Sequence, residues 1–290
     1  MVQDVRVVLI KMADRLHNMR TIGSMPPAKK LKIAAETSFI FAPLAHRLGL
    51  YKIKTEFQDR CMQILNPDDY NDIAKELAAT EAGRSAYIKS FLKPLESKLE
   101  KVIYDKEVAN DKREFFKLKY DVKGRTKSIY SIWNKIQKKG VGLNEIYDIF
   151  AVRFILNVDD DKELEKRLCW QVYSLITDVY KPIAERLKDW VTSPKANGYE
   201  SLHTTVVGPD GKFVEVQIRT KRMDEIAEKG FAAHWKYKGQ KLTHDHYGDW
   251  LDNVRIILES TNSNALEFIN DFKTNLFQEE VYVYLSLIHI

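Results

Sequence analysis

The spacing of apolar residues changes partway along the chain, and this change limits the folds that it can adopt. Up to residue 104, apolar side chains recur three and four positions apart, as they do from Leu9 to Met19, which predicts helices. No convincing strand precedes Arg113, and beyond it strand-like and helix-like segments alternate. The sequence therefore predicts an α+β chain, in which a helical region precedes a mixed sheet flanked by helices.

Prolines, glycines and apolar spacing set the expected element bounds. Pro26–Pro27 is expected to open a helix near Ala28, and Pro43 to bend or interrupt the next stretch. The expected helical stretches are Leu31–Leu48, Tyr51–Leu65, Asp68–Tyr104, Thr126–Lys139, Asp161–Tyr180 and Lys221–Trp235. The expected strands are Glu114–Asp121, Asp148–Leu156, Leu202–Val207 and Lys212–Arg219, with a hairpin turn at residues 209–211.

Bulk composition argues against membrane and disulfide-rich secreted proteins. Hydrophobic residues make up 44% and charged residues 30% of the 290-residue chain, which is typical of globular proteins. No apolar run reaches the roughly 18–20 residues that cross a bilayer, and no signal-peptide pattern opens the chain, so we expect a cytoplasmic protein. The two cysteines form no zinc or disulfide pattern. A net charge of +5 favours anionic partners such as nucleotides, nucleic acid or the ribosome.

Residues 123–128, Lys-Gly-Arg-Thr-Lys-Ser, form the first candidate ligand site. A strand is expected to enter this glycine turn and a helix to leave it, and the free N–H groups of a helix N-terminus suit phosphate. A basic stripe of the helix would consist of Lys127, Ser131, Lys135 and Lys138. The alternative is a solvated lysine face.

Acidic residues in two strands are the next candidates. Asp148 begins an otherwise apolar strand that also carries Arg153, and it is a candidate Mg²⁺ ligand or else a strand-end charge that reaches water. Glu215 lies at mid-strand, where a rigid backbone suits a metal ligand or a base. Its face consists of Phe213, Glu215, Gln217 and Arg219. The alternative for this face is the ordinary solvent-facing side of a sheet.

Two more segments are rich in polar groups. Residues 186–189 and 194–204 are dense in side chains that bind phosphate, sugar or base, although a plain surface loop has a similar composition. Near the N-terminus, Asp14, Asn18 and Thr21 share a helical stripe. Asp14 is either a metal ligand or a buried aspartate paired with a neighbouring arginine (Arg15 or Arg20), and the second interpretation is the commoner in proteins.

Seven segments, in order, resemble motifs of the RelA/SpoT homologue family over about residues 4–240. They are Lys11–Thr21, Phe41–Gly49, Gly124–Ile132, Tyr147–Arg153, Asn197–Thr204, Val214–Thr220 and Ala232–Tyr237. The resemblance implies a long bifunctional parent that makes and hydrolyses (p)ppGpp in the stringent response. It implies a helical remnant of an HD-type hydrolase domain with linking helices at 1–108, a nucleotidyltransferase-like synthetase domain at 109–276 and the start of a TGS domain at 277–290.

The resemblance also implies a reaction, in which the diphosphate of ATP moves to the 3′-hydroxyl of GDP or GTP with Mg²⁺ as cofactor. The implied ATP-binding residues are Arg125, Lys127, Lys135 and Arg153. Asp148 and Glu215 would be the catalytic and metal-binding pair, with Glu215 activating the hydroxyl. The implied GDP/GTP-binding residues are Lys195, Asn197, Tyr199, His203 and Gln217. Tyr199 would stack on guanine through its ring face, so its hydroxyl is expected to be dispensable.

The chain departs from the family pattern at the hydrolase site. Only Asp14, Asn18 and Thr21 match there, which implies an incomplete Mn²⁺ site and no hydrolase activity. A fragment is expected, without the C-terminal domains through which the ribosome would be contacted, and residues 285–290 are candidates for a non-native tail. Apolar surface is expected between Leu9 and Leu48. Neither a membrane nor DNA is an expected partner.

Two rival functions differ in the residues that they require. A nucleotidyltransferase that extends nucleic acid would show a Gly-Ser start and a paired Asp-x-Asp, and neither occurs around Asp148 or Glu215. A catalytically inactive nucleotide- or ribosome-binding fragment of the same parent would not need these two carboxylates together with the arginines and lysines.

Overall fold

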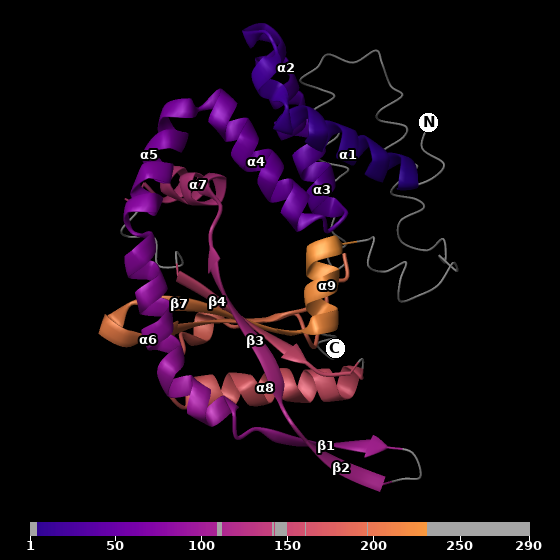
Figure 1. Ribbon diagram of the computed structural model, residues 1–290, viewed down its shortest axis with the longest axis vertical. Coiled ribbons are helices and arrows are strands. Elements are labelled where there is room, and N and C mark those ends of the chain that lie inside the picture. The colour runs from indigo at the N-terminus through magenta and orange to yellow at the C-terminus, as the bar shows by residue number, and fades with distance from the viewer. Residues whose placement is uncertain are drawn as a thin grey trace, which may run out of the picture.

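The computed structural model describes residues 5–108, 112–140, 142, 150–159, 161–195 and 197–230. Helices occupy the first part of this range and a mixed sheet the second, so the predicted α+β architecture is confirmed (Figure 1). Asp148, a predicted metal ligand, lies outside the described residues. Within the described ranges, no helix has both the length and the apolar character needed to cross a membrane.

Short helices follow one another through the N-terminal part. They are α1 (Val5–Arg20), α2 (Pro27–Glu36), α3 (Ala42–Arg47), α4 (Tyr51–Leu65), α5 (Pro67–Ala79) and α6 (Glu81–Leu99), with the 3-10 turn η1 (Ile22–Ser24) and the π-helical η2 (Thr37–Phe41). Pro27 starts α2, where a missing N–H costs nothing. The interruption expected at Pro43 lies where η2 gives way to α3.

The first four helices enclose an apolar core. Its buried members include Met12, Met19, Ala45, Leu48 and Phe57. Ile10 and Leu31 stay 67% and 51% exposed, so the apolar surface expected between Leu9 and Leu48 is present. The stretch expected as one helix from Asp68 to Tyr104 is two helices separated at Thr80, and its last residues form a strand.

The main sheet has the strand order β3-β4-β7-β6-β5. Its strands are β3 (Lys119–Thr126), β4 (Phe150–Asn157), β5 (Lys188–Asp189), β6 (Leu202–Val207) and β7 (Phe213–Thr220). The central pair β4–β7 is parallel, and the other neighbours are antiparallel. The turn between β6 and β7 is the expected hairpin turn, in which Asp210 and Gly211 take positive φ.

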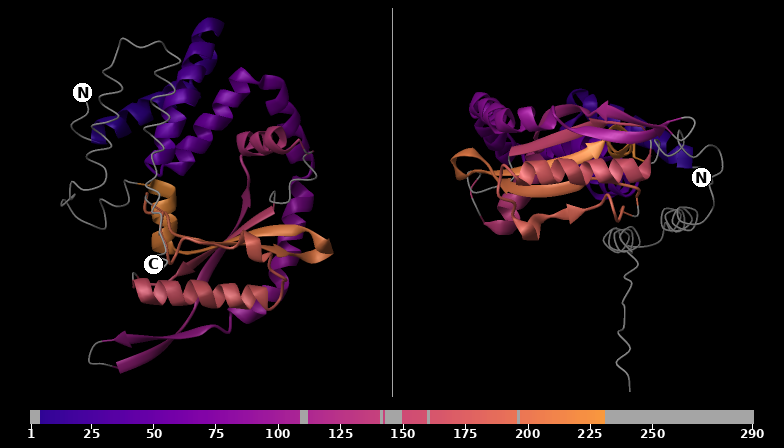
Figure 2. Two further views of the ribbon diagram at one scale, coloured as in Figure 1. Left: turned by 180° about the vertical axis from the view of Figure 1, so that it is seen from behind. Right: turned by 90° about the horizontal axis from the view of Figure 1, so that it is seen from below.

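Alternation along the strands gives the sheet one apolar and one polar face. Val214, Val216 and Ile218 of β7 belong to a core shared with α6 and with α8 (Lys162–Thr177), and Figure 2 shows α8 lying along one side of the sheet. The side chain of Asp161 caps α8 by accepting the backbone N–H groups of Glu163 and Leu164. The opposite face carries the polar residues of β7 and is approached by α9 (Lys221–Lys229).

A hairpin that the sequence did not predict precedes the sheet. β1 (Ile103–Val108) pairs antiparallel with β2 (Lys112–Lys117), and the hairpin extends away from the main sheet in Figure 1. The predicted single strand Glu114–Asp121 is therefore wrong, because buried Leu118 separates β2 from β3 and its N–H donates to the carbonyl of Val102. The domain boundary expected after residue 108 falls between β1 and β2.

Candidate active site

Gln217 occupies the middle of the polar face, on β7, and is 2% exposed. Its Nε2 donates to Oε1 of Glu215 at 2.8 Å, and its Oε1 accepts a long 3.5 Å hydrogen bond from Nη1 of Arg125. Gln217 therefore links a residue of β3 to the predicted catalytic carboxylate. Because Gln217 is buried, this face is not the ordinary solvent-facing side that the alternative interpretation required.

His203, on β6, extends the same set of contacts. Its Nδ1 lies 3.5 Å from Oε1 of Glu215, and its Nε2 lies 2.9 Å from the hydroxyl of Tyr199. Burial lowers the pKa of His203 despite the neighbouring Glu215, so the ring is neutral at pH 7. Since a carboxylate only accepts hydrogen bonds, Nδ1 carries the proton and Nε2 accepts from Tyr199. The contacts thus run from Arg125 through Gln217, Glu215 and His203 to Tyr199.

The charge state of Glu215 follows from its neighbours. Burial by itself would raise its pKa, but hydrogen bonds from His203 and Gln217 and the charge of Lys127 outweigh burial and lower the pKa from 4.5 to about 2. Glu215 is therefore an ionised carboxylate at neutral pH. Such a group suits a cation or a hydroxyl donor, but it is a weak proton acceptor.

Tyr199 belongs to the acceptor loop, which we define as residues 190–201 between β5 and β6. Its ring meets that of Trp190 edge to face at 5.7 Å, and the Trp190 ring meets that of His203 at 4.7 Å. Nζ of Lys195 lies 4.2 Å from the centroid of Trp190. Trp190 was missed in the sequence, although its position directly after the segment 186–189, which carries Arg186 and Lys188, was a signal.

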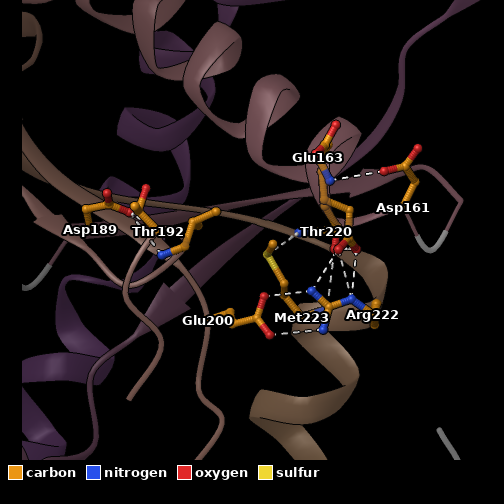
Figure 3. Close-up of polar contacts among 10 residues, drawn as sticks. Asp161, Glu163, Asp189, Thr192, Glu200, Thr220, Arg222 and Met223 are labelled. Atoms are coloured by element: carbon orange, nitrogen blue, oxygen red, sulfur yellow. Dashed lines mark hydrogen bonds and ion pairs between the residues drawn. The ribbon is translucent and has the colours of Figure 1, made fainter. Parts of the chain in front are cut away.

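Charged side chains fix the base of the acceptor loop (Figure 3). Arg222 of α9 donates to both oxygens of Glu200 at 3.0 and 2.6 Å. It also binds Glu165, a fully buried residue of α8, through a 2.7 Å contact from Nη2. Glu165 further accepts the hydroxyl of Thr220. Although burial lowers the pKa of Arg222, these carboxylates raise it above its ordinary value, so Arg222 stays charged.

The two arginines predicted to bind ATP differ in their surroundings. Arg125 is exposed, whereas Nη1 of Arg153 donates to Asp224 at 3.3 Å and to Glu228 at 3.0 Å of α9. Buried Arg219 is close by, with Nε 2.9 Å from Oδ1 of Asp224, but the contact lacks hydrogen-bond geometry. Burial lowers the pKa of Arg219 to about 10. Arg219 and the α9 carboxylates were not among the predicted site residues.

A cavity of about 530 Å³ lies beside this face, between α4 and α9. Among the predicted site residues that the structure describes, Arg125 lines this cavity. The other lining residues are Tyr51, Lys52, Thr55, Glu56, Asp59, Arg60, Gln63, Tyr70, Ala227 and Glu228. The cavity therefore opens next to Arg125 rather than over Glu215.

The predicted phosphate turn has a different structure. β3 continues through Thr126, and α7 (Ile129–Lys139) begins only after Ser128, whose Oγ accepts the N–H of Ser131 at 3.2 Å. A Cβ at Gly124 would lie 3.0 Å from Cδ1 of Ile88, so this glycine allows α6 to approach the strand. Lys127 precedes α7 and does not belong to the helical stripe, whereas Lys135 lies within the helix.

The N-terminal stripe also differs from expectation. Asp14 is exposed, with Nδ2 of Asn18 3.5 Å from its Oδ2, so the predicted buried aspartate is wrong. The arginines pair elsewhere: Arg15 with Glu36 at 3.1 Å, and Arg20 with Glu56 at 2.7 Å. Thr21 donates its hydroxyl to the carbonyl of His17. Over the part of the chain that the structure describes, no three His, Cys, Asp or Glu side chains are grouped to hold a metal.

Both the sheet region and the N-terminal helices match known protein families. Residues 124–242 match the family described as "Region found in RelA / SpoT proteins", and residues 1–51 match an HD domain. The bifunctional (p)ppGpp synthase/hydrolase SpoT of Escherichia coli is 41% identical over 98% of this chain. A GTP pyrophosphokinase of Myxococcus xanthus is 38% identical, also over 98%. The chain spans 38% and 35% of the lengths of these two relatives.

Solved structures of smaller proteins also align with the chain. The small alarmone synthetase 2 of Bacillus subtilis is 22% identical, and the alignment covers 71% of this chain and 90% of that one with a TM-score of 0.36.

Proposed function

Because this chain belongs to the RelA/SpoT family, we propose that it transfers the β,γ-diphosphate of ATP to the 3′-hydroxyl of GDP or GTP. The observation that carries the proposal is the series of contacts from Arg125 through Gln217, Glu215 and His203 to Tyr199. It joins a candidate donor-binding arginine, an ionised carboxylate and a candidate base-stacking ring on one face of a sheet. An enzyme that uses ATP and GTP would act in the cytoplasm.

The acceptor nucleotide would bind at the acceptor loop. Tyr199 would stack on guanine, with Lys195, Asn197 and His203 around the nucleotide. An ionised Glu215 would accept a hydrogen bond from the 3′-hydroxyl and orient it. Because the pKa of Glu215 is about 2, orientation is its main contribution, rather than lasting removal of the proton.

The donor nucleotide would bind beside Arg125. The cavity between α4 and α9 offers space for adenine next to this exposed guanidinium, and Arg153 would complete the stack on release from the α9 carboxylates. Lys127 and Lys135 would offset the phosphate charge. In the reaction, the 3′-oxygen forms a bond to the β-phosphorus, the bond from that phosphorus to the α–β bridging oxygen breaks, AMP leaves, and the proton of the hydroxyl passes to solvent.

The proposed cofactor is Mg²⁺, held by Asp148 and Glu215. Glu215 fits this role because its carboxylate is ionised and held at mid-strand by Gln217. When bound, Mg²⁺ would neutralise charge on the transferred phosphates. The remaining work of binding and alignment belongs to the side chains described above.

The test is to incubate the full chain with ATP, GDP and Mg²⁺ and to separate the nucleotides by anion exchange. We expect AMP and guanosine 3′,5′-bis(diphosphate) in equal amounts. Two matched controls should give neither product: 3′-deoxy-GDP, which lacks the acceptor hydroxyl, and α,β-methylene-ATP, in which the bond to be broken is blocked. ADP or inorganic phosphate as the main product would contradict the proposal.

A further inference from the structure

We propose that Tyr51, the first residue of α4, positions the acceptor loop from the helical part of the chain. Tyr51 would hold the tip of the loop in the shape that receives a guanine nucleotide. This inference rests on the proposed function for the identity of the ligand. It adds to that function a residue outside the sheet region that determines acceptor affinity.

Two hydrogen bonds of Asn197 connect Tyr51 to Tyr199 of the loop. Nδ2 of Asn197 donates to the Tyr51 hydroxyl at 2.8 Å, and Oδ1 of Asn197 accepts the backbone N–H of Tyr199 at 3.2 Å. Asn197 therefore uses both ends of its amide, one toward the helix and one toward the residue proposed to stack on guanine. Loss of the first contact would leave Asn197 free to rotate away from the second.

Aromatic contacts join α3, α4 and the acceptor loop at the same place. The ring of Tyr51 meets the ring of Tyr199 edge to face at 5.6 Å. The Tyr51 ring also meets the ring of His46, in α3, edge to face at 5.6 Å. Tyr51 is thus fixed by its own helical segment and can serve as a rigid support for Tyr199.

The backbone brings α4 to this position through two glycines. A Cβ at Gly230, directly after α9, would lie 2.6 Å from both the carbonyl carbon of Gly49 and the carbonyl oxygen of Leu48. The turn between α3 and α4 therefore rests directly against the end of α9, and Figure 1 shows these helix ends adjacent. The same turn approaches the loop, since a Cβ at Gly49 would lie 3.8 Å from the carbonyl oxygen of Asn197.

The two ends of the loop are anchored differently. Glu200 at its base binds Arg222, as Figure 3 shows. Arg222 is fixed in turn by Glu165. At the tip, the Tyr51 hydroxyl is an anchor from outside the sheet region. Removing that hydroxyl should therefore disturb acceptor binding without unfolding the loop, and it should leave ATP binding largely unchanged because the ring that lines the cavity is retained.

The experiment measures GDP and ATP binding to the full chain by isothermal titration calorimetry, in parent, Tyr51→Phe and Tyr180→Phe. Tyr180 is the matched control, because its hydroxyl donates to the carbonyl of Phe91 in α6 at 2.9 Å and so also joins the sheet region to a helix. We expect Tyr51→Phe to raise the Kd for GDP by about threefold to tenfold, the range of one lost hydrogen bond. Tyr180→Phe should leave it unchanged.

Synthesis assays on the same proteins separate this inference from the proposed function. Equal GDP affinity in parent and Tyr51→Phe overturns the inference even if the parent makes product. A parent that binds GDP, is weakened by Tyr51→Phe and makes no product overturns the proposed function alone. A parent that binds no GDP overturns both. An equal loss of GDP and ATP affinity in Tyr51→Phe would show a general structural role and would also overturn the inference.

Discussion

The hydroxyl of Tyr199 lies 2.9 Å from Nε2 of His203, and through the other nitrogen of that ring it is connected to Glu215. A residue expected to act only through its ring face therefore has a second contact, in which its hydroxyl donates to a neutral histidine. The hydroxyl fixes the orientation of His203, and His203 helps to keep Glu215 ionised. Guanine binding and the charge at the proposed reaction centre are linked in this way.

For Tyr199, two substitutions separate the ring from the hydroxyl. Tyr199→Ala should weaken GDP binding by about 1–3 kcal/mol through loss of stacking. Tyr199→Phe should weaken it by about 1 kcal/mol, because only the hydrogen bond to His203 is lost. KM values for GDP and ATP measured in parallel test both, with the ATP value as the internal control. A Phe variant identical to the parent would show that the hydroxyl has no role.

Removing the charge of Glu215 should abolish synthesis while sparing the fold. Glu215→Gln keeps the size of the side chain but loses the anion that would hold a cation and orient the hydroxyl, so kcat should fall by about 100-fold or more. The control is Glu185→Gln, the same change at an exposed residue of η4 (Ala184–Arg186). Asp148→Asn is expected to behave like Glu215→Gln. Near-parental turnover in Glu215→Gln would remove this residue from the site.

Glu215 should also make stability depend on pH. Its folded-state pKa is depressed from 4.5 to about 2, so its contribution is present above pH 4.5 and is lost as pH falls toward 2. The difference in free energy of unfolding between parent and Glu215→Gln should therefore shrink between about pH 5 and pH 3. The pKa of Glu56 is likewise lowered to about 2 by Arg20 and Arg60. Because Glu56 is present in both proteins, its contribution to stability cancels in the difference. Urea unfolding across this range measures the difference, and a constant difference would contradict the assigned pKa.

Gly230 should tolerate no side chain. Its φ is +56°, and an added Cβ would meet the backbone of Leu48 and Gly49 at 2.6 Å, so Gly230→Ala should cost about 2–4 kcal/mol in stability. Gly140→Ala is the matched control, since Gly140 has a φ of +62° at the end of α7 with no described atom within 4 Å of an added Cβ. It should cost only about 1 kcal/mol. Thermal unfolding compares the two, and equal losses would mean that the close approach contributes nothing.

Local patterns predicted the parts of the molecule that depend on neighbours in sequence. The alternation along β7 correctly put Glu215 and Gln217 on one face, and the helix expected from Asp161 corresponds to α8. The strand β1 was missed because its charged centre, Tyr-Asp-Lys-Glu, hides the alternation, and it is stabilised by pairing with β2.

Contacts between distant segments could not be predicted in the same way. Tyr51 and Asn197 are 146 positions apart, and no periodicity relates them. The pairing of Arg153 with α9 depends on a helix whose place on the sheet was unknown from sequence. Gly124 was interpreted from its local sequence as part of a phosphate-binding turn. In the structure, the absence of a side chain at Gly124 instead allows α6 to approach the strand.

The parallel pairing of β4 with β7 has a consequence for how the chain folds. β4 ends at Asn157, and its partner begins at Phe213, so this ladder closes only after the whole intervening segment has been made. Hairpins such as β1–β2 and β6–β7 join strands that are adjacent in sequence and can form early, whereas a ladder between distant strands is slow to nucleate. Arg153 and Gln217 are neighbours across that late ladder. During translation, a nascent chain would therefore complete the helices that precede the sheet first, and it would gain the ability to bind both nucleotides together only after β7 has been made.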